Sequence, residues 1–140
     1  MDTVDAYLGA LPGGVRRVAH GEWGLTLPPE SAGGWPLDVG LRLAEGLLTV
    51  KAAALGPAED LDPWMLLWWN RQTRFVRFAA TQSREIWVHA DLAATDVDEP
   101  ALDRLLGLVT EGALAVRGYA QRVRDPKPAA EGGWLTEKRR

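Results

Sequence analysis

The strongest constraint on the fold is one long apolar stripe near the C-terminus. Over 99–124, apolar residues recur at helical spacing: Leu102, Leu105, Leu106, Val109, Ala113, Val116, Ala120 and Val123. Asp98 or Thr95 can cap this helix, and Pro100 fits its first turn. A helix with one apolar stripe has to bury it against another element. We expect close packing on a sheet at its three glycines, Gly107, Gly112 and Gly118.

Segments with a period of two can form that sheet. Val39, Leu41 and Leu43 alternate with less apolar residues, and Glu45-Gly46 is a plausible tight turn. The return strand continues the apolar face with Leu48, Val50, Ala52 and Ala54. Residues 15–27 form a strand or a ragged hairpin, and 28–36 is a loop rich in proline and glycine.

Two further strands are expected over 74–81 and 85–91. A two-residue loop between them would put Val76 and Phe78 on one face with Trp87 and His89. A three-residue loop gives one wholly apolar face: Val76, Phe78, Ala80, Ile86, Val88 and Ala90. Because a one-residue slip moves the whole core set to solvent, we predict an odd loop or a bulge.

Two shorter helices complete the pattern. Asp2 or Thr3 can cap the first, and Asp62 followed by Pro63 predicts the second over 63–72. The element order is therefore α-β-β-β-α-β-β-α, which predicts an α+β fold with a single antiparallel sheet of about five strands flanked by helices. We expect one domain over 1–125 and a C-terminal tail over 126–140.

The composition excludes several classes of protein. The chain has no cysteine, which rules out a disulfide scaffold, thiolate metal sites and a thiol nucleophile. No secretory signal opens the sequence, and its densest apolar run, 64–69, is far below the roughly 20 residues of a membrane span. We therefore expect a cytoplasmic protein without a membrane partner. The net charge of -3 argues against non-specific duplex binding.

Candidates for catalysis are few. The chain has two histidines, His20 and His89, and two serines, Ser31 and Ser83, and none lies in a nucleophile or metal-binding motif. A triad could still converge in space, since triads need no sequence motif. We expect no enzymatic activity, no cofactor and no metal.

Seven tryptophans are the unusual feature of the composition. The helix expected over 63–72 carries Trp64, Met65, Trp68 and Trp69, and is apolar on all sides. One sheet covers only one side of such a helix, so the remainder predicts a dimer or partner interface. The alternative is cover by the chain's own loop 28–36 with Trp35. Trp23, Trp35 and Trp134 suggest no specific role.

Arginines and aromatic residues interleave in the next segment. We predict a client-binding face formed by Arg71, Arg74, Phe75, Arg77, Trp87 and His89. In the odd-loop register, Phe75, Arg77, Trp87 and His89 share the sheet face away from the core. Such a face can dock an acidic, aromatic peptide or stack the bases of a single-stranded nucleic acid. A merely solvated face is the third interpretation.

Residues 66–78, 85–92 and the long helix after Glu99 resemble the YbjN-like bacterial proteins, which share the fold of type III secretion chaperones. The resemblance covers about 37–123 and includes Asn70 after the short helix. It implies a small, acidic, homodimeric protein that binds other proteins without catalysis. The dense tryptophans and the long proline- and glycine-rich loop depart from that pattern.

These observations predict a non-catalytic, homodimeric chaperone or adaptor for a protein client. Candidate clients are a stress-response protein or a DNA-maintenance protein, such as a single-stranded-DNA-binding protein. The alternative function is direct binding of single-stranded nucleic acid through the face of arginines and tryptophans.

Overall fold

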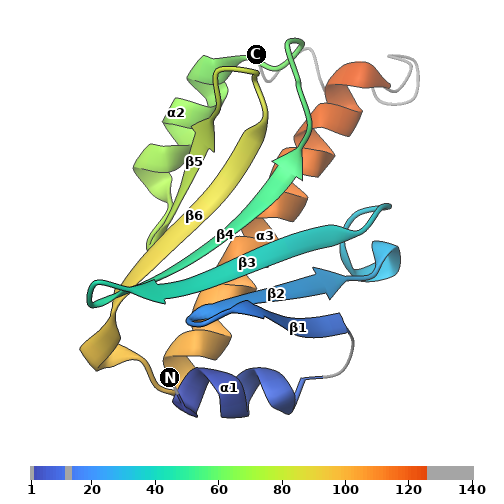
Figure 1. The fold of residues 1–140 in the computed structure, drawn as a ribbon. Coiled ribbons are helices and arrows are strands. Elements are labelled where there is room, and N and C mark those ends of the chain that lie inside the picture. Colours follow the sequence, from blue (N-terminus) through green and yellow to red (C-terminus); the bar gives the residue numbers. More distant parts are fainter. Residues whose placement is uncertain (1, 12–13, 126–140) are drawn as a thin grey trace.

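The computed structural model describes residues 2–11 and 14–125, which form an α+β fold with one antiparallel sheet (Figure 1). The sheet has six strands in the order β1-β2-β3-β4-β6-β5. In chain order the helices and strands are α1 (Asp2–Gly9), β1 (Gly14–Ala19), β2 (Glu22–Leu27), β3 (Leu37–Ala44), β4 (Leu47–Leu55), α2 (Pro63–Gln72), β5 (Val76–Ala80), β6 (Ile86–Ala93) and α3 (Glu99–Arg124). The predicted fold class is confirmed, and the tail over 126–140, with Trp134, lies outside the described residues.

The sheet has one strand more than the five expected, because the segment 15–27 is a complete hairpin. Gly21 turns the chain between β1 and β2 with a φ of 72°, a conformation that glycine adopts without strain. The Gly21 carbonyl also accepts the backbone N–H of Leu43 at 2.8 Å, which ties the turn to β3.

The two other hairpins follow the sequence pattern. Glu45 and Gly46 both have positive φ, as a two-residue hairpin turn of the predicted kind requires. Between β5 and β6, the Thr81 N–H donates to the Glu85 carbonyl at 3.0 Å, which leaves a three-residue loop. Val76 therefore lies opposite Ala90. The odd loop and the apolar inner face are confirmed.

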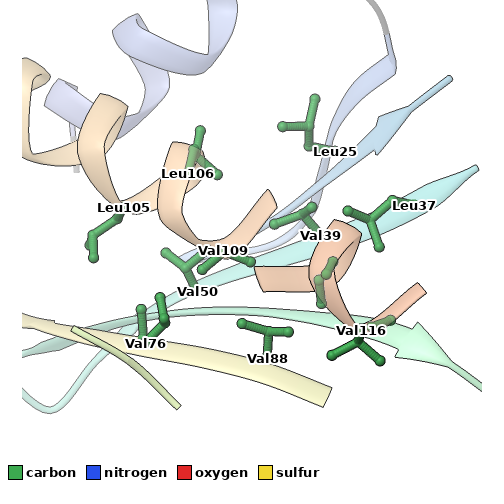
Figure 2. Packing of buried hydrophobic residues seen from close by; sticks show 14 of the residues in the cluster. Leu25, Leu37, Val39, Val50, Val76, Val88, Leu105, Leu106, Val109 and Val116 are labelled. Atoms are coloured by element: carbon green, nitrogen blue, oxygen red, sulfur yellow. The ribbon is translucent and has the colours of Figure 1, made fainter. Parts of the chain in front are cut away.

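Helix α3 crosses the inner face of the sheet and buries its stripe there (Figures 1 and 2). Asp98 caps it by accepting the Ala101 N–H at 2.9 Å. The stripe is buried from Leu102 to Ala120, while Val123 is 40% exposed and lies beyond the sheet's cover. No described helix is long and apolar enough to cross a membrane.

Of the three glycines of α3 predicted to pack closely on the sheet, one does so. A Cβ on Gly112 would come within 3.0 Å of Val88 Cγ1, so the helix approaches β6 closely there. A Cβ on Gly107 would meet nothing within 4 Å, and one on Gly118 would meet only Arg122 of the same helix. The prediction is wrong for these two because both face away from the sheet.

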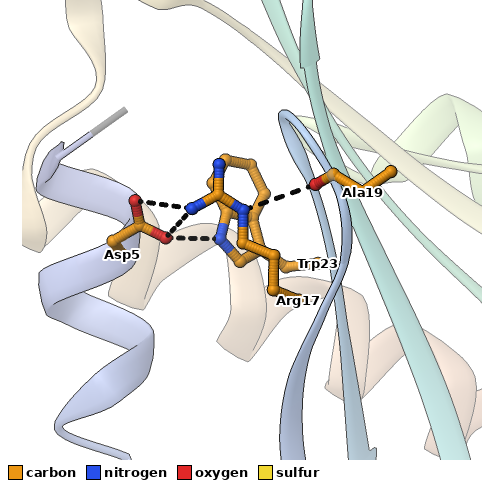
Figure 3. Close-up of polar contacts among 4 residues, drawn as sticks. All are labelled: Asp5, Arg17, Ala19 and Trp23. Carbon is orange, nitrogen blue, oxygen red and sulfur yellow. Dashed lines mark hydrogen bonds and ion pairs between the residues drawn. The ribbon is translucent and has the colours of Figure 1, made fainter.

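Trp23 joins α1 to the first hairpin (Figure 3). Its indole N–H donates to Asp5 Oδ1 at 2.8 Å, and the Arg17 guanidinium lies 5.6 Å from its ring centroid. Arg17 also contacts Asp5 at 3.4 Å and the Ala19 carbonyl at 3.4 Å. This tryptophan, which suggested no role in the sequence, stabilises the packing of α1.

Candidate protein-binding surfaces

Four large side chains on the outward side of α2 are in contact with water. The exposed fractions are 75% for Trp64, 36% for Met65, 56% for Leu67 and 55% for Trp68. We call these four residues the α2 face. The helix begins where the sequence predicts, with Asp62 accepting the Trp64 N–H at 3.0 Å. Its position beside β5 buries only one side of the helix, so the apolar residues on the other side stay uncovered (Figure 1).

Trp69, predicted as an interface residue, turns toward the core instead. Its ring centroid lies 5.5 Å from those of Phe78 and Tyr119, and the side chain is half-buried. Leu66 beside it is the one fully buried residue of α2. The structure therefore separates Trp69, which is half-buried, from the exposed Trp64 and Trp68.

Asn70 seals the edge strand β5 against α2. Its side-chain amide donates to the Phe78 carbonyl at 3.0 Å and its oxygen accepts the Phe78 N–H at 2.7 Å. Thr73 donates to the Val76 carbonyl at 2.7 Å. An edge strand exposes unpaired backbone groups that invite another strand, and these contacts occupy three of them.

The loop 28–36 does not cover the α2 face, because Arg117 binds it to α3. The buried Arg117 guanidinium donates to four backbone carbonyls: Ala32, Trp35, Pro36 and Ala54. The Trp35 ring lies over it, with the guanidinium carbon 4.2 Å from the ring centroid. Burial lowers the pKa of Arg117 from its ordinary value. Cover of α2 by this loop, the alternative weighed from the sequence, is wrong.

The outer face of the sheet carries three of the predicted client-binding residues. Arg77 pairs with Asp91 at 2.8 Å and lies opposite His89. The Trp87 ring has the Lys51 ammonium 5.6 Å from its centroid. Burial lowers the pKa of His89, and Lys51 and Arg77 lower it further while Asp91 opposes them. No described helix packs on this face (Figure 1).

The other three predicted client-binding residues lie elsewhere. Phe75 precedes β5 with a φ of 69°, which breaks the strand alternation, and the Arg104 guanidinium of α3 lies 5.9 Å from its ring centroid. The prediction that Phe75 shares the outer face is therefore wrong. Arg74 also lies toward α3, and Arg71 is exposed in the last turn of α2.

A mainly apolar groove of about 290 Å³ lies where α2, β5 and α3 meet. Arg74 and Glu111 lie at this groove, whose apolar lining includes Trp69, Val76, Phe78 and Leu108. Among residues 2–11 and 14–125, no group of three or more acidic or histidine side chains is placed to hold a metal ion.

The backbone is similar to chains in three solved protein complexes. A chain of the HopA1–SchA chaperone–effector complex matches with a TM-score of 0.66 and 14% identity, over 84% of this chain and 91% of that chain. The chain has a type III secretion chaperone-like fold. This confirms the fold that the resemblance implied, while membership of the YbjN-like family stays a prediction.

Two further complexes give the same result. A chain of the ExsC–ExsE complex matches with a TM-score of 0.59 and 16% identity, over 80% of this chain and 89% of that chain. A third match is a chain from the complex of the Yersinia pestis type III secretion chaperone SycH with a stable fragment of YscM2. It matches with a TM-score of 0.61 and 15% identity, over 81% of this chain and 96% of that chain. No family model and no curated protein sequence matches.

Proposed function

We propose that this protein is a homodimeric chaperone or adaptor that binds a protein client, with the α2 face as the dimer contact. The observation that carries the proposal is the exposure of Trp64 and Trp68 on one side of one helix. At about 250 Å² for a tryptophan side chain, their exposed fractions leave roughly 300 Å² of indole surface in water. The largest apolar patch on a typical monomer is about this size and is often functional.

The fold supports the protein-binding part of the proposal. Its structural neighbours include a chaperone–effector complex and a secretion chaperone bound to a fragment of another protein. A shared fold does not establish a shared function, so the proposal for this chain depends on the exposed α2 face. The client itself is proposed only as a class, a stress-response or DNA-maintenance protein.

Light scattering on the purified full chain tests the dimer. We expect a dimer at micromolar concentration for the wild type and a monomer for the double variant Trp64→Ser, Trp68→Ser. The matched control is Val18→Ser, which removes another exposed apolar side chain from β1 and should leave the mass unchanged. A monomeric wild type would refute the proposed dimer.

Affinity capture from native extract followed by reconstitution tests the client. We expect one captured protein to form a complex of fixed stoichiometry with the purified chain. Capture of nucleic acid alone, with no protein that can be reconstituted, would contradict the proposal. It would favour the alternative of single-strand binding, which Arg77 supports poorly because Asp91 already neutralises it.

A further inference from the structure

Two glycines lie opposite each other on neighbouring strands of the sheet, although their backbone conformation does not require glycine. Gly24 of β2 lies opposite Gly40 of β3, and neither has a positive φ. A Cβ on Gly40 would meet only the Lys51 carbonyl, at 4.0 Å, which is ordinary contact. A Cβ on Gly24 would meet only the movable guanidinium of Arg16, at 3.1 Å. Glycine in a strand interior weakens the strand by about 0.5–1 kcal/mol.

The glycine pair forms the floor of a groove on the outer face of the sheet. The groove has a volume of about 490 Å³, and its walls include Arg16, Val18, Arg42 and Lys51. No described helix covers this side (Figure 1). The space above Gly40 is open, and the space above Gly24 is occupied by the Arg16 guanidinium, a flexible group that has to move aside to admit a partner. A glycine in a strand often marks a place where another backbone approaches closely.

The charge of the groove is opposite to that of the chain. Its charged lining consists of Arg16, Arg42, Lys51 and Glu22, which sum to +2 in a chain with a net charge of -3. Glu22 pairs with Arg42 at 3.7 Å in an exposed contact, which is a weak interaction. Arg16 donates to the Thr26 hydroxyl at 3.0 Å, and that hydroxyl donates to the Asp38 carboxylate at 2.7 Å. Within the described residues neither Arg16 nor Lys51 forms a direct ion pair.

We propose that this groove binds an extended acidic segment of a protein partner, whose backbone lies over Gly24 and Gly40. Carboxylates of the segment meet Arg16, once its guanidinium has moved off Gly24, and Lys51, whose ammonium lies toward Trp87 of β6. The inference rests on the proposed function in that the partner is a protein, and it adds the chemistry of the partner and the place where the partner binds. This groove is distinct from the α2 face, which lies at the other end of the sheet beside β5.

The test is a fluorescence-anisotropy titration of the full chain with a short labelled peptide carrying glutamate at alternate positions. The charge-reversed lysine peptide and oligothymidylate are titrated in parallel. We expect the wild type to bind the glutamate peptide, more weakly as salt rises, and to bind the other two probes much less. Gly40→Val should weaken binding at least about tenfold while raising the thermal midpoint, because a β-branched residue suits the strand.

A second variant keeps the test independent of packing at Gly40. Lys51→Glu should also weaken binding of the glutamate peptide at least about tenfold. Its matched control is Arg84→Glu in the β5–β6 loop, away from the groove. The proposal is overturned if the wild type fails to bind the peptide, or if both groove variants bind as tightly as wild type. Tighter binding of oligothymidylate, lost in the same variants, would overturn it in favour of nucleic acid.

Light scattering separates this proposal from the proposed dimer. The groove variants should leave the mass unchanged, and Trp64→Ser with Trp68→Ser should leave peptide binding unchanged. A groove variant that dissociates the dimer would show that a second copy occupies the groove, which refutes the acidic segment. An unchanged mass in the α2 variant would refute the dimer contact alone.

Discussion

Replacing Arg117 with methionine tests how the loop 28–36 is held. Methionine keeps much of the volume but removes every donor to four backbone carbonyls. The carbonyl of Ala54 lies at the buried end of β4 and cannot reach water without local opening, which costs about 1–3 kcal/mol. The other three carbonyls belong to a loop that can relax into solvent, so each loses a net bond of about 0.5–1.5 kcal/mol.

The sum predicts that Arg117→Met lowers the free energy of unfolding by about 2.5–7.5 kcal/mol, a large part of the 5–15 kcal/mol typical of a domain. Urea denaturation measures this loss, and hydrogen exchange should show faster exchange confined first to the loop. Arg122→Met, an exposed change on the same helix, is the control and should lie within about 0.5 kcal/mol of wild type. A loss below about 1 kcal/mol for Arg117→Met would refute the reasoning.

Two other substitutions test local contacts. Asn70→Ala leaves the N–H and carbonyl of Phe78 without their partner and should lower the free energy of unfolding by about 1–3 kcal/mol in urea denaturation; an unchanged midpoint would mean that water replaces the amide. Because the folded pKa of His89 is lowered, protonation favours the unfolded chain, so stability should fall as pH drops below about 6.5 toward the folded pKa. His89→Gln should reduce that fall, and identical pH profiles of the urea midpoint for both proteins would contradict it.

Local signals predicted much of the fold. Asp62-Pro63 and Asp98 fixed the starts of α2 and α3, because capping is decided by neighbouring residues. The alternation around Val76 and Ile86 predicted the register of β5 and β6, since only one register buries a uniform apolar face. The β1–β2 hairpin was ambiguous because His20-Gly21 is a weak turn signal beside short, mixed strands.

Long-range contacts explain what the sequence could not predict. Arg117 reaches carbonyls 63 and 85 positions away, and a buried arginine whose partners among the described residues are backbone carbonyls has no local sequence pattern. Phe75 left the predicted face because of a single left-handed residue ahead of β5. Gly24 and Gly40 are visible in the sequence as glycines inside alternating segments, but only the pairing of β2 with β3 brings them together.

The proposed dimer places α2 at the contact between two copies of this chain. Hydrogen exchange of residues 63–72, compared between dilute and concentrated protein, tests it most directly. We expect slower exchange of these amides as the light-scattering mass rises, with little change in β1 and β2. A rise in mass without any added protection of α2 would place the interface elsewhere and contradict the claim.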